Sequence, residues 1–275
     1  MFKLLSISEL VRYQRSRMPA LLLVALTMFL CTAALATGRP AAASSWMINV
    51  VLAAFFIMQF RLWDDLSDVE SDRRVFPERV LCQAKSLVGF RIVLVLLFIV
   101  NVTLLAAYKS ESSLIPFLIL SFLFLVWYSV RGRMRFPSVY SKNIVLLKYP
   151  VFVYLLTSNA VELETMVNSS CGMSLTFLCF CIYELLHDSL VGPIKDVQQL
   201  LMMEMIAMIL VGILMIYDLI GSSKILVVIH SGLVIIGIVV LACLFQRYRN
   251  QVAPGRWCYA VFLVGFVWLL NYAAR

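Results

Sequence analysis

The sequence predicts an all-α, polytopic membrane protein with nine transmembrane helices and a cytoplasmic N-terminus. Its 275 residues are 63% hydrophobic and only 14% charged. A water-soluble domain of this length does not bury so much apolar surface in one core. Two further observations support the prediction. Apolar stretches recur along the whole chain, and the basic residues gather in alternate loops.

Nine apolar stretches are long enough to cross about 30 Å of hydrocarbon. They cover residues 19–36, 46–62, 87–107, 114–130, 143–157, 172–186, 201–217, 225–245 and 257–272. The first is expected to remain in the protein, because no small-residue pattern marks a signal-peptide cleavage site after it. No internal repeat and no Pro/Gly-rich linker interrupts the series. We therefore expect residues 1–275 to form a single integral membrane domain.

Basic residues distinguish the two sides of the membrane. With nine spans, all but four of the 23 Lys and Arg residues fall on the same side as the N-terminus. The four on the other side are Arg39, Lys109, Lys224 and Arg275. Cytoplasmic loops carry the excess of Lys and Arg, so the N-terminus is predicted to be cytoplasmic. The net charge of +8 is thus spread over loops, without the contiguous basic stripe of a nucleic-acid-binding protein.

Seven cysteines are scattered along the chain, most of them inside the apolar stretches. They form no CxxC pair and no spacing typical of metal ligands. We expect them to be reduced residues that contribute to packing.

An acidic run follows the second stretch directly. Residues 61–79 read RLWDDLSDVESDRRVFPER, with six acids in fifteen positions. If the helix continues, Asp65, Asp68 and Asp72 share one stripe, Asp64 joins Asp68 one turn away, and Glu70 points elsewhere. Like charges one turn apart repel each other, and more strongly where the dielectric constant is low. The stripe therefore requires a cation.

Magnesium is the predicted cation. The hard carboxylate oxygens have no histidine or thiol near them, and Mg²⁺ typically bridges one or two carboxylates to substrate phosphates. The predicted ligands are Asp64, Asp65, Asp68 and Asp72, and a diphosphate is the natural third partner. The alternative is a solvated loop in which the acids form ion pairs with Arg73, Arg74 and Arg79.

A second acidic pair ends the sixth stretch, in CIYELLHDSLVGPIKD. Glu184 and Asp188 stand four residues apart on one helix face, with His187 beside them and Asp196 in the following loop. Both acidic segments lie at the predicted cytoplasmic ends of their spans, so both can face one cavity. The alternative is that this pair makes ordinary helix-terminal caps and ion pairs.

The acidic run resembles the first motif of the UbiA superfamily of intramembrane prenyltransferases. The family pattern Asn-Asp-x-x-Asp-x-x-x-Asp appears as the segment 64–72, DDLSDVESD, with Asp64 in place of the asparagine. The basic, proline-containing segment 73–79 is similar to the tail of that motif. The family's second motif is reduced here to Glu184 and Asp188. Residues 128–133, YSVRGR, are similar to the family segment that contacts the diphosphate.

The resemblance implies nine helices around a central cavity and Mg²⁺-dependent transfer of a prenyl group from an isoprenyl diphosphate to an aromatic or other small nucleophilic acceptor. This is a transferase reaction of isoprenoid biosynthesis that releases diphosphate. It implies catalytic roles for Asp65, Asp68, Asp72, Glu184 and Asp188. The implied metal ligands are Asp64, Asp65, Asp68, Asp72, Glu184 and Asp188. The candidate diphosphate-binding residues are Arg73, Tyr128, Arg131, Arg133 and Lys148.

Membrane enclosure would also keep a prenyl carbocation away from water. Several rings could offer a π-face to it: Phe124, Trp127, Tyr128, Tyr149, Tyr154 and Tyr183. Glu204 lies inside the seventh stretch, where an acidic side chain is expected to have a polar partner or a function. A role as a base towards the acceptor is one hypothesis.

Two alternative functions stay open. A UbiA-type terpene cyclase would ionise the same diphosphate and close the chain on itself without an acceptor. A cation transporter would line a translocation path with these acids, although they gather at one predicted membrane face. No sequence feature names the acceptor, the prenyl chain length or the oligomeric state.

Overall fold

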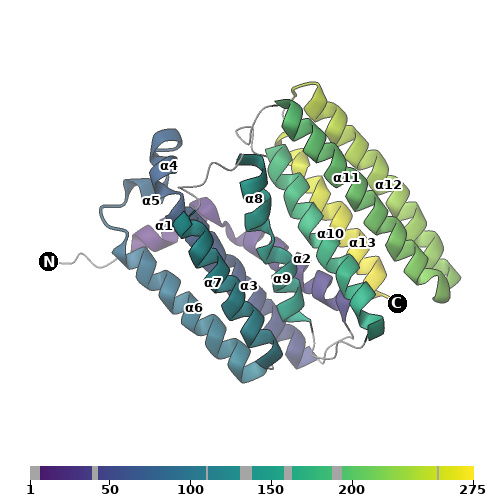
Figure 1. The fold of residues 1–275 in the computed structure, drawn as a ribbon, viewed down its shortest axis with the longest axis horizontal. Coiled ribbons are helices and arrows are strands. Elements are labelled where there is room, and N and C mark those ends of the chain that lie inside the picture. The colour runs from purple at the N-terminus through teal and green to yellow at the C-terminus, as the bar shows by residue number, and fades with distance from the viewer. Residues whose placement is uncertain are drawn as a thin grey trace. The chain divides into compact units, whose positions relative to one another are not determined.

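The computed structural model describes residues 7–38, 43–109, 111–130, 138–157, 163–187, 194–252 and 254–275. Within these ranges every regular element is a helix (Figure 1). The helices that bear on the acidic run are α1 (Ile7–Arg17), α3 (Ala43–Ser67), α4 (Val69–Val75) and α5 (Val80–Gln83). The remaining helices are α2 (Ala20–Thr37), α6 (Val88–Tyr108), α7 (Glu111–Val130), α8 (Ser138–Leu146), α9 (Lys148–Leu156), α10 (Leu163–His187), α11 (Ile194–Asp218), η2 (Leu219–Gly221), α12 (Lys224–Arg249), η3 (Gly255–Tyr259) and α13 (Ala260–Ala273).

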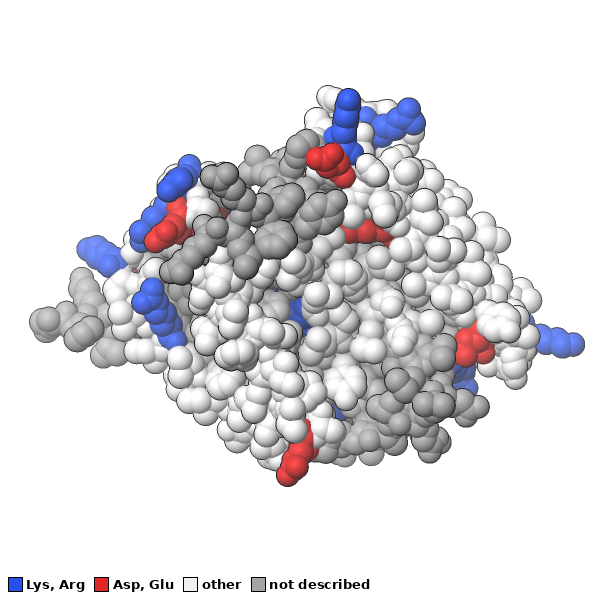
Figure 2. Space-filling view, in the orientation of Figure 1, with Lys and Arg blue, Asp and Glu red and all other residues white. Residues whose placement is uncertain are grey.

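Eight described segments are long and apolar enough to cross a membrane, and they characterise a multi-pass integral membrane protein. They are Ala20–Thr37, Trp46–Ser67, Val88–Tyr108, Glu111–Val130, Ser170–His187, Ile194–Gly221, Lys224–Arg249 and Gly255–Ala273. The all-α, polytopic class is thereby confirmed, while the cytoplasmic N-terminus stays a prediction. On the face shown in Figure 2, uncharged side chains cover most of the surface, as expected for a surface that faces lipid.

The predicted fifth span, residues 143–157, is divided between α8 and α9, with a turn at Leu147. Each of these helices has nine residues, too few to cross the bilayer alone. Pro150 supplies a physical reason for the break. It has no N–H to donate to the carbonyl of Leu146, so a continuous helix through this point would lose a hydrogen bond. Pro150 is tolerated in the first turn of α9, where such a donor is not needed.

The chain divides into two compact units. The first contains Met1–Met28 and Ala42–Ile115, and the second contains Phe29–Ala41 and Pro116–Arg275. The single domain over residues 1–275 stays a prediction.

Helices α3 and α6 pack together in the first unit. At their contact the Asn101 amide donates a hydrogen bond of 2.7 Å to the Gln59 amide oxygen, and both side chains are completely buried. Hydrogen bonds of this kind join helices within membranes, where apolar contact alone gives little preference for protein over lipid. A hydrophobic cluster next to the acidic run includes Tyr13, Leu62, Val69, Val80, Leu81, Phe90 and Leu97.

Helices α11, α12 and α13 of the second unit meet around Trp268, which is 1% exposed. Its indole N–H donates to the Leu233 carbonyl over 3.0 Å. Two glycines make room for the ring. A Cβ added at Gly212 would lie 2.7 Å from the indole, and one added at Gly237 would lie 2.5 Å from it. Small residues that admit a large neighbour are typical of helix interfaces in membranes.

We predict that Gly237→Ala lowers the thermal stability of the detergent-solubilised protein. The new methyl group must displace Trp268 or separate the two helices, and such overpacking costs about 1–3 kcal/mol. Gly232→Ala on the same helix is the matched control, because its added Cβ meets nothing within 4 Å. Equal melting temperatures for the two variants would contradict this packing.

Candidate active site

The acidic run lies where α3 passes into α4. The backbone N–H of Asp68 donates to the Asp64 carbonyl over 3.1 Å, and that of Asp72 donates to the Asp68 carbonyl over 2.8 Å. The i to i−4 hydrogen bonds therefore continue through the junction, and helical spacing of the acids is preserved. Glu70 is exposed, which confirms that it points away from the stripe.

Asp65 is the most buried acid of the run, at 6% exposure. Arg17 from α1 donates two hydrogen bonds to the Asp65 carboxylate: Nη2 donates to Oδ1 over 2.6 Å and Nε donates to Oδ2 over 3.1 Å. Oδ2 also accepts the Tyr13 hydroxyl proton over 2.8 Å. Arg61, one turn earlier on α3, approaches the same oxygen at 3.6 Å. Both carboxylate oxygens are thus engaged by protein donors.

Tyr13 completes this cluster from the apolar side. Burial, followed by the charge of Asp65, raises the pKa of its phenol, so the hydroxyl keeps its proton and acts as a donor. The ring packs edge-on against Phe90 with 5.6 Å between centroids. Tyr13 and Arg17 therefore hold α1 against the end of α3.

Asp72 forms an ion pair with Arg79, whose guanidinium lies 4.0 Å from the centre of the Phe76 ring. The predicted alternative of acid–arginine pairing is thus confirmed for this residue. Asp65 and Asp72 also line one small cavity, together with Tyr13, Arg17, Arg79, Val80 and Leu81. Its volume of about 10 Å³ leaves space for one water molecule at most.

The remaining acids of the run fit Mg²⁺ by their chemistry and position. Asp64 and Asp68 are one helical turn apart and only partly buried, so hard oxygens are accessible at the end of a membrane span. No group of three possible ligands gathers within the described part of the chain. Mg²⁺ does not require one, because it commonly binds one or two carboxylates and completes its shell with water and substrate phosphate. Asp65 fits less well, since its oxygens are already engaged.

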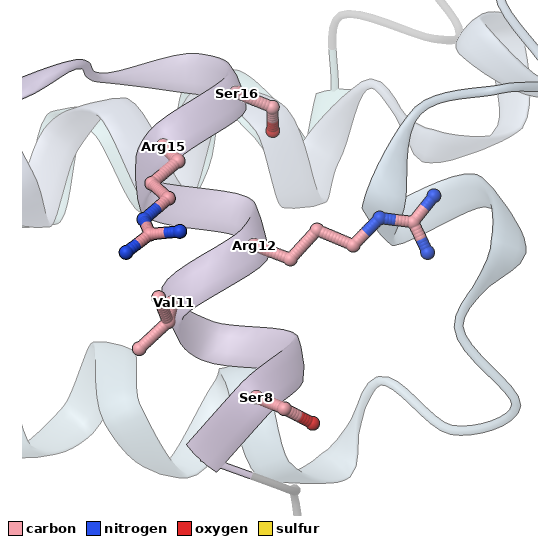
Figure 3. Close-up of a pocket in the computed structure, with 5 residues that line it drawn as sticks. All are labelled: Ser8, Val11, Arg12, Arg15 and Ser16. Atoms are coloured by element: carbon pink, nitrogen blue, oxygen red, sulfur yellow. The ribbon is translucent and has the colours of Figure 1, made fainter.

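A groove runs along α1 next to this cluster. It is lined by Ser8, Val11, Arg12, Arg15 and Ser16 (Figure 3). Arg12 and Arg15 leave the helix in different directions. Arg12 donates to the Gln83 side chain over 2.9 Å, which adds a second attachment between α1 and the segment after the acidic run.

The second acidic pair is described only in part. Glu184 is half-buried in the last turns of α10, whereas Asp188 lies outside the described residues. Tyr183 stacks on His187 with 5.2 Å between ring centres and contacts Tyr259 and Phe262. A cavity shared by the two acidic segments stays a prediction.

Of the candidate diphosphate-binding residues, Arg131 and Arg133 lie outside the described residues. Arg73 is exposed in the last turn of α4. Tyr128 is half-buried and edge-on to Phe124. Lys148 is 2% exposed, and its ammonium lies 5.9 Å from the Phe124 ring centre and 5.4 Å from that of Tyr149.

The aromatic residues near Lys148 form a continuous group in the second unit. Tyr149 stacks face to face on Phe180. Phe180 in turn contacts Phe262, which contacts Tyr183. Three of the predicted rings, Phe124, Tyr149 and Tyr183, therefore belong to or adjoin this group, whereas Tyr154 is exposed.

Glu204 is buried in α11 at 7% exposure. Its Oε1 accepts a hydrogen bond of 2.7 Å from the Asn143 amide. Sequence reasoning identified Glu204 as needing a polar partner but did not identify Asn143, because the two residues are 61 positions apart.

Comparison with known proteins adds one match. No protein-family model matches the sequence, and no curated protein sequence does. Among solved structures, digeranylgeranylglyceryl phosphate synthase matches with a TM-score of 0.66 over 98% of each chain, at 13% sequence identity. That protein is a UbiA-superfamily intramembrane prenyltransferase.

The chain has the UbiA fold. This confirms the all-α, polytopic fold class that the acidic motif implied, whereas the nine spans and the central cavity stay predictions. At such low identity the similarity concerns the fold alone, and the roles of individual residues in this UbiA-fold chain depend on the chemistry described above.

The contacts of Arg17 and Tyr13 with Asp65 could not be predicted from the sequence. In the sequence, Arg17 is only one of the basic residues that predict membrane orientation. Its partner is 48 positions away, and the only sequence signal is a basic, partly apolar segment before the first span of a chain that carries an acidic run.

We predict that Asp65 stabilises the attachment of α1 whether or not metal is present. Asp65→Asn should lower the free energy of unfolding by about 2 kcal/mol, because it leaves Arg17 without its charged partner. Arg17→Met should cost a similar amount, and the double variant little more. Urea titrations in detergent with EDTA would measure the cycle.

Arg15→Met is the control for that cycle, because Arg15 is exposed on the same helix. If Asp65→Asn destabilised the protein only when Mg²⁺ was present, Asp65 would be a metal ligand and not an anchor for α1.

Proposed function

We propose that this chain is a Mg²⁺-dependent intramembrane prenyltransferase. It would ionise an isoprenyl diphosphate, transfer the prenyl group to a small acceptor with a nucleophilic atom, and release diphosphate. The observation that carries the proposal is the acidic run at the end of a membrane span in a chain with the UbiA fold. The matched synthase acts in membranes, as the proposal requires.

Within the run we assign metal binding chiefly to Asp64 and Asp68, because they are one helical turn apart and partly exposed at the end of a membrane span. Bound Mg²⁺ would neutralise the charge that develops on the departing diphosphate. Asp72 would hold Arg79 in place, and the exposed guanidinium of Arg73 suits bidentate contact with phosphate oxygens. Asp65 would contribute by fixing the end of α3 through Arg17.

In the second unit we assign the diphosphate-facing role to Glu184, Asp188, Tyr128, Arg131, Arg133 and Lys148. The buried ammonium of Lys148 is costly in hydrocarbon, which favours a functional role for it. The rings beside it can stabilise nearby positive charge through their π-faces and exclude water from a reactive prenyl cation.

The proposal predicts that Asp68→Asn lowers product formation by roughly 100-fold or more, because the amide cannot replace a charged metal ligand in stabilising the leaving group. Glu70→Gln removes an exposed acid of the same run and should retain activity. The assay would supply labelled prenyl diphosphates of graded length with phenols, quinone precursors, indoles and lipid alcohols, in Mg²⁺ or in EDTA. Size-exclusion chromatography would confirm that each variant is folded.

Full activity of Asp68→Asn, or equal activity in EDTA, would contradict the assigned metal site. A cyclic hydrocarbon or alcohol formed without any acceptor would instead identify a membrane terpene cyclase.

A further inference from the structure

Helix α1 lies close to the end of a membrane span. Only Met18 and Pro19 separate its last residue from α2, the first apolar span. The chain between them reaches at most about 11 Å, so α1 cannot be far from the hydrocarbon. Four charged side chains among its eleven residues make α1 too polar to enter the hydrocarbon itself. Its place is therefore the interface between lipid headgroups and water.

The two faces of α1 have different environments. On the inner face, Tyr13 and Arg17 bind Asp65. At 100° per residue, the residues that line the groove lie on the opposite face of the same helix. These residues are Ser8, Val11, Arg12, Arg15 and Ser16 (Figure 3). A ligand in this groove would therefore be distinct from a diphosphate held by the acidic run.

The groove combines positive charge with an exposed apolar side chain. Arg12 projects to one side of α1 together with Ser8 and Ser16, and Arg15 projects to the other side together with Val11 (Figure 3). Val11 is 41% exposed. The groove encloses about 490 Å³, within the range of roughly 300–1,000 Å³ that is typical of small-ligand sites. An anionic group with an apolar part fits this combination.

The protein itself uses little of the donor capacity of these arginines. Arg12 donates one hydrogen bond to the Gln83 side chain, whereas a guanidinium has five N–H donors. Arg15 makes no hydrogen bond and no ion pair with another described residue. Glu9, the acid of α1, does not line the groove. Most of these donors are therefore open to a ligand from outside the chain.

An anionic phospholipid meets these requirements. The distribution of basic residues predicts that α1 faces the cytoplasmic leaflet, whose surface is negatively charged. Because Arg12 and Arg15 leave α1 in different directions, they present charge over the width of the helix and not at one point. Such a spread suits the headgroups of a membrane surface better than a single small anion.

We propose that the outer face of α1 binds an anionic phospholipid headgroup. The lipid phosphate accepts charge-assisted hydrogen bonds from Arg15 and from the N–H groups of Arg12 that do not contact Gln83. Because the inner face of the same helix holds Asp65, lipid binding also stabilises the attachment of α1 to the end of α3. The lipid composition of the membrane thereby influences the stability of the segment that carries the acidic run.

The test adds dioleoylphosphatidylglycerol or dioleoylphosphatidylcholine, in equal amounts, to the detergent-solubilised protein. At a concentration that just saturates wild type, the anionic lipid should raise the melting temperature by roughly 3 °C or more, and the zwitterionic lipid should not. Arg12→Gln/Arg15→Gln should lose this increase. Each basic residue near an anionic surface strengthens binding about fivefold, so the loss of two weakens it about 25-fold.

Two other double variants are the controls. Arg12→Lys/Arg15→Lys keeps the charge and should keep most of the increase. Arg247→Gln/Arg249→Gln removes two exposed arginines from the last turn of α12, which is predicted to end at the same membrane face, and should also keep it. If Arg12→Gln/Arg15→Gln does not fold, Arg15→Gln alone carries the test, with lipid affinity lowered about fivefold.

Native mass spectrometry gives a readout that does not depend on melting. Wild type released from detergent with an equimolar mixture of the two lipids should retain one more phosphatidylglycerol molecule than Arg12→Gln/Arg15→Gln does. Equal lipid retention by these two proteins, or an equal temperature increase in both, would overturn the proposal. An equal effect of phosphatidylcholine or of inorganic phosphate on wild type would also overturn it. None of these readouts depends on prenyl transfer, so such a result would leave the proposed function standing.

Discussion

The cost of placing charge in hydrocarbon determines where this chain can carry out polar chemistry. Most of its charged residues therefore stay outside the spans. Asp65 is held by Arg17 and Tyr13, and Lys148 lies beside two aromatic rings. Glu204 has a partner for one oxygen only.

The contacts of Asp65 with Arg17 and Tyr13 indicate that part of the acidic run has a structural role. By sequence all four aspartates were equivalent candidates for metal binding. In the structure Asp65 pairs with Arg17 and attaches α1 to the end of α3, and Asp72 pairs with Arg79 and attaches the segment after α4 to α4 itself. A rigid end of this kind suits metal binding, because ligands act with precision only when their own positions are fixed by surrounding contacts. Asp65 and Asp72 would thus hold in place the part of the run that carries the proposed metal ligands Asp64 and Asp68.

Much of this organisation could be predicted from the sequence, because the signals are local. The lengths of the apolar stretches predicted the membrane spans. Helical spacing predicted that the aspartates share one stripe and that Glu70 points away from it. The resemblance in residues 64–72 indicated the UbiA fold that the structural match confirms. The break at Leu147 was missed because the apolar pattern continues through it, although Pro150 could have signalled it.

Contacts between distant segments could not be predicted. The Arg17–Asp65 and Asn143–Glu204 pairs join residues 48 and 61 positions apart, and nothing in either segment specifies its partner. Asp188, Arg131 and Arg133 lie outside the described residues, so their roles stay predictions. The pairing of Asp65 with Arg17 and of Asp72 with Arg79 also depends on tertiary contacts, since pairing with an arginine and binding a metal require the same type of residue.

The proposed prenyl transfer requires carboxylates at the end of α3 to bind a prenyl diphosphate through a divalent ion. Calorimetric titration of the protein in lipid nanodiscs with an unreactive prenyl thiodiphosphate, in the presence of Mg²⁺ or of EDTA, measures this binding. We expect binding that requires Mg²⁺ and is lost when Asp64 and Asp68 are both replaced by asparagine. Equally tight binding in EDTA, or by the doubly substituted protein, would contradict it.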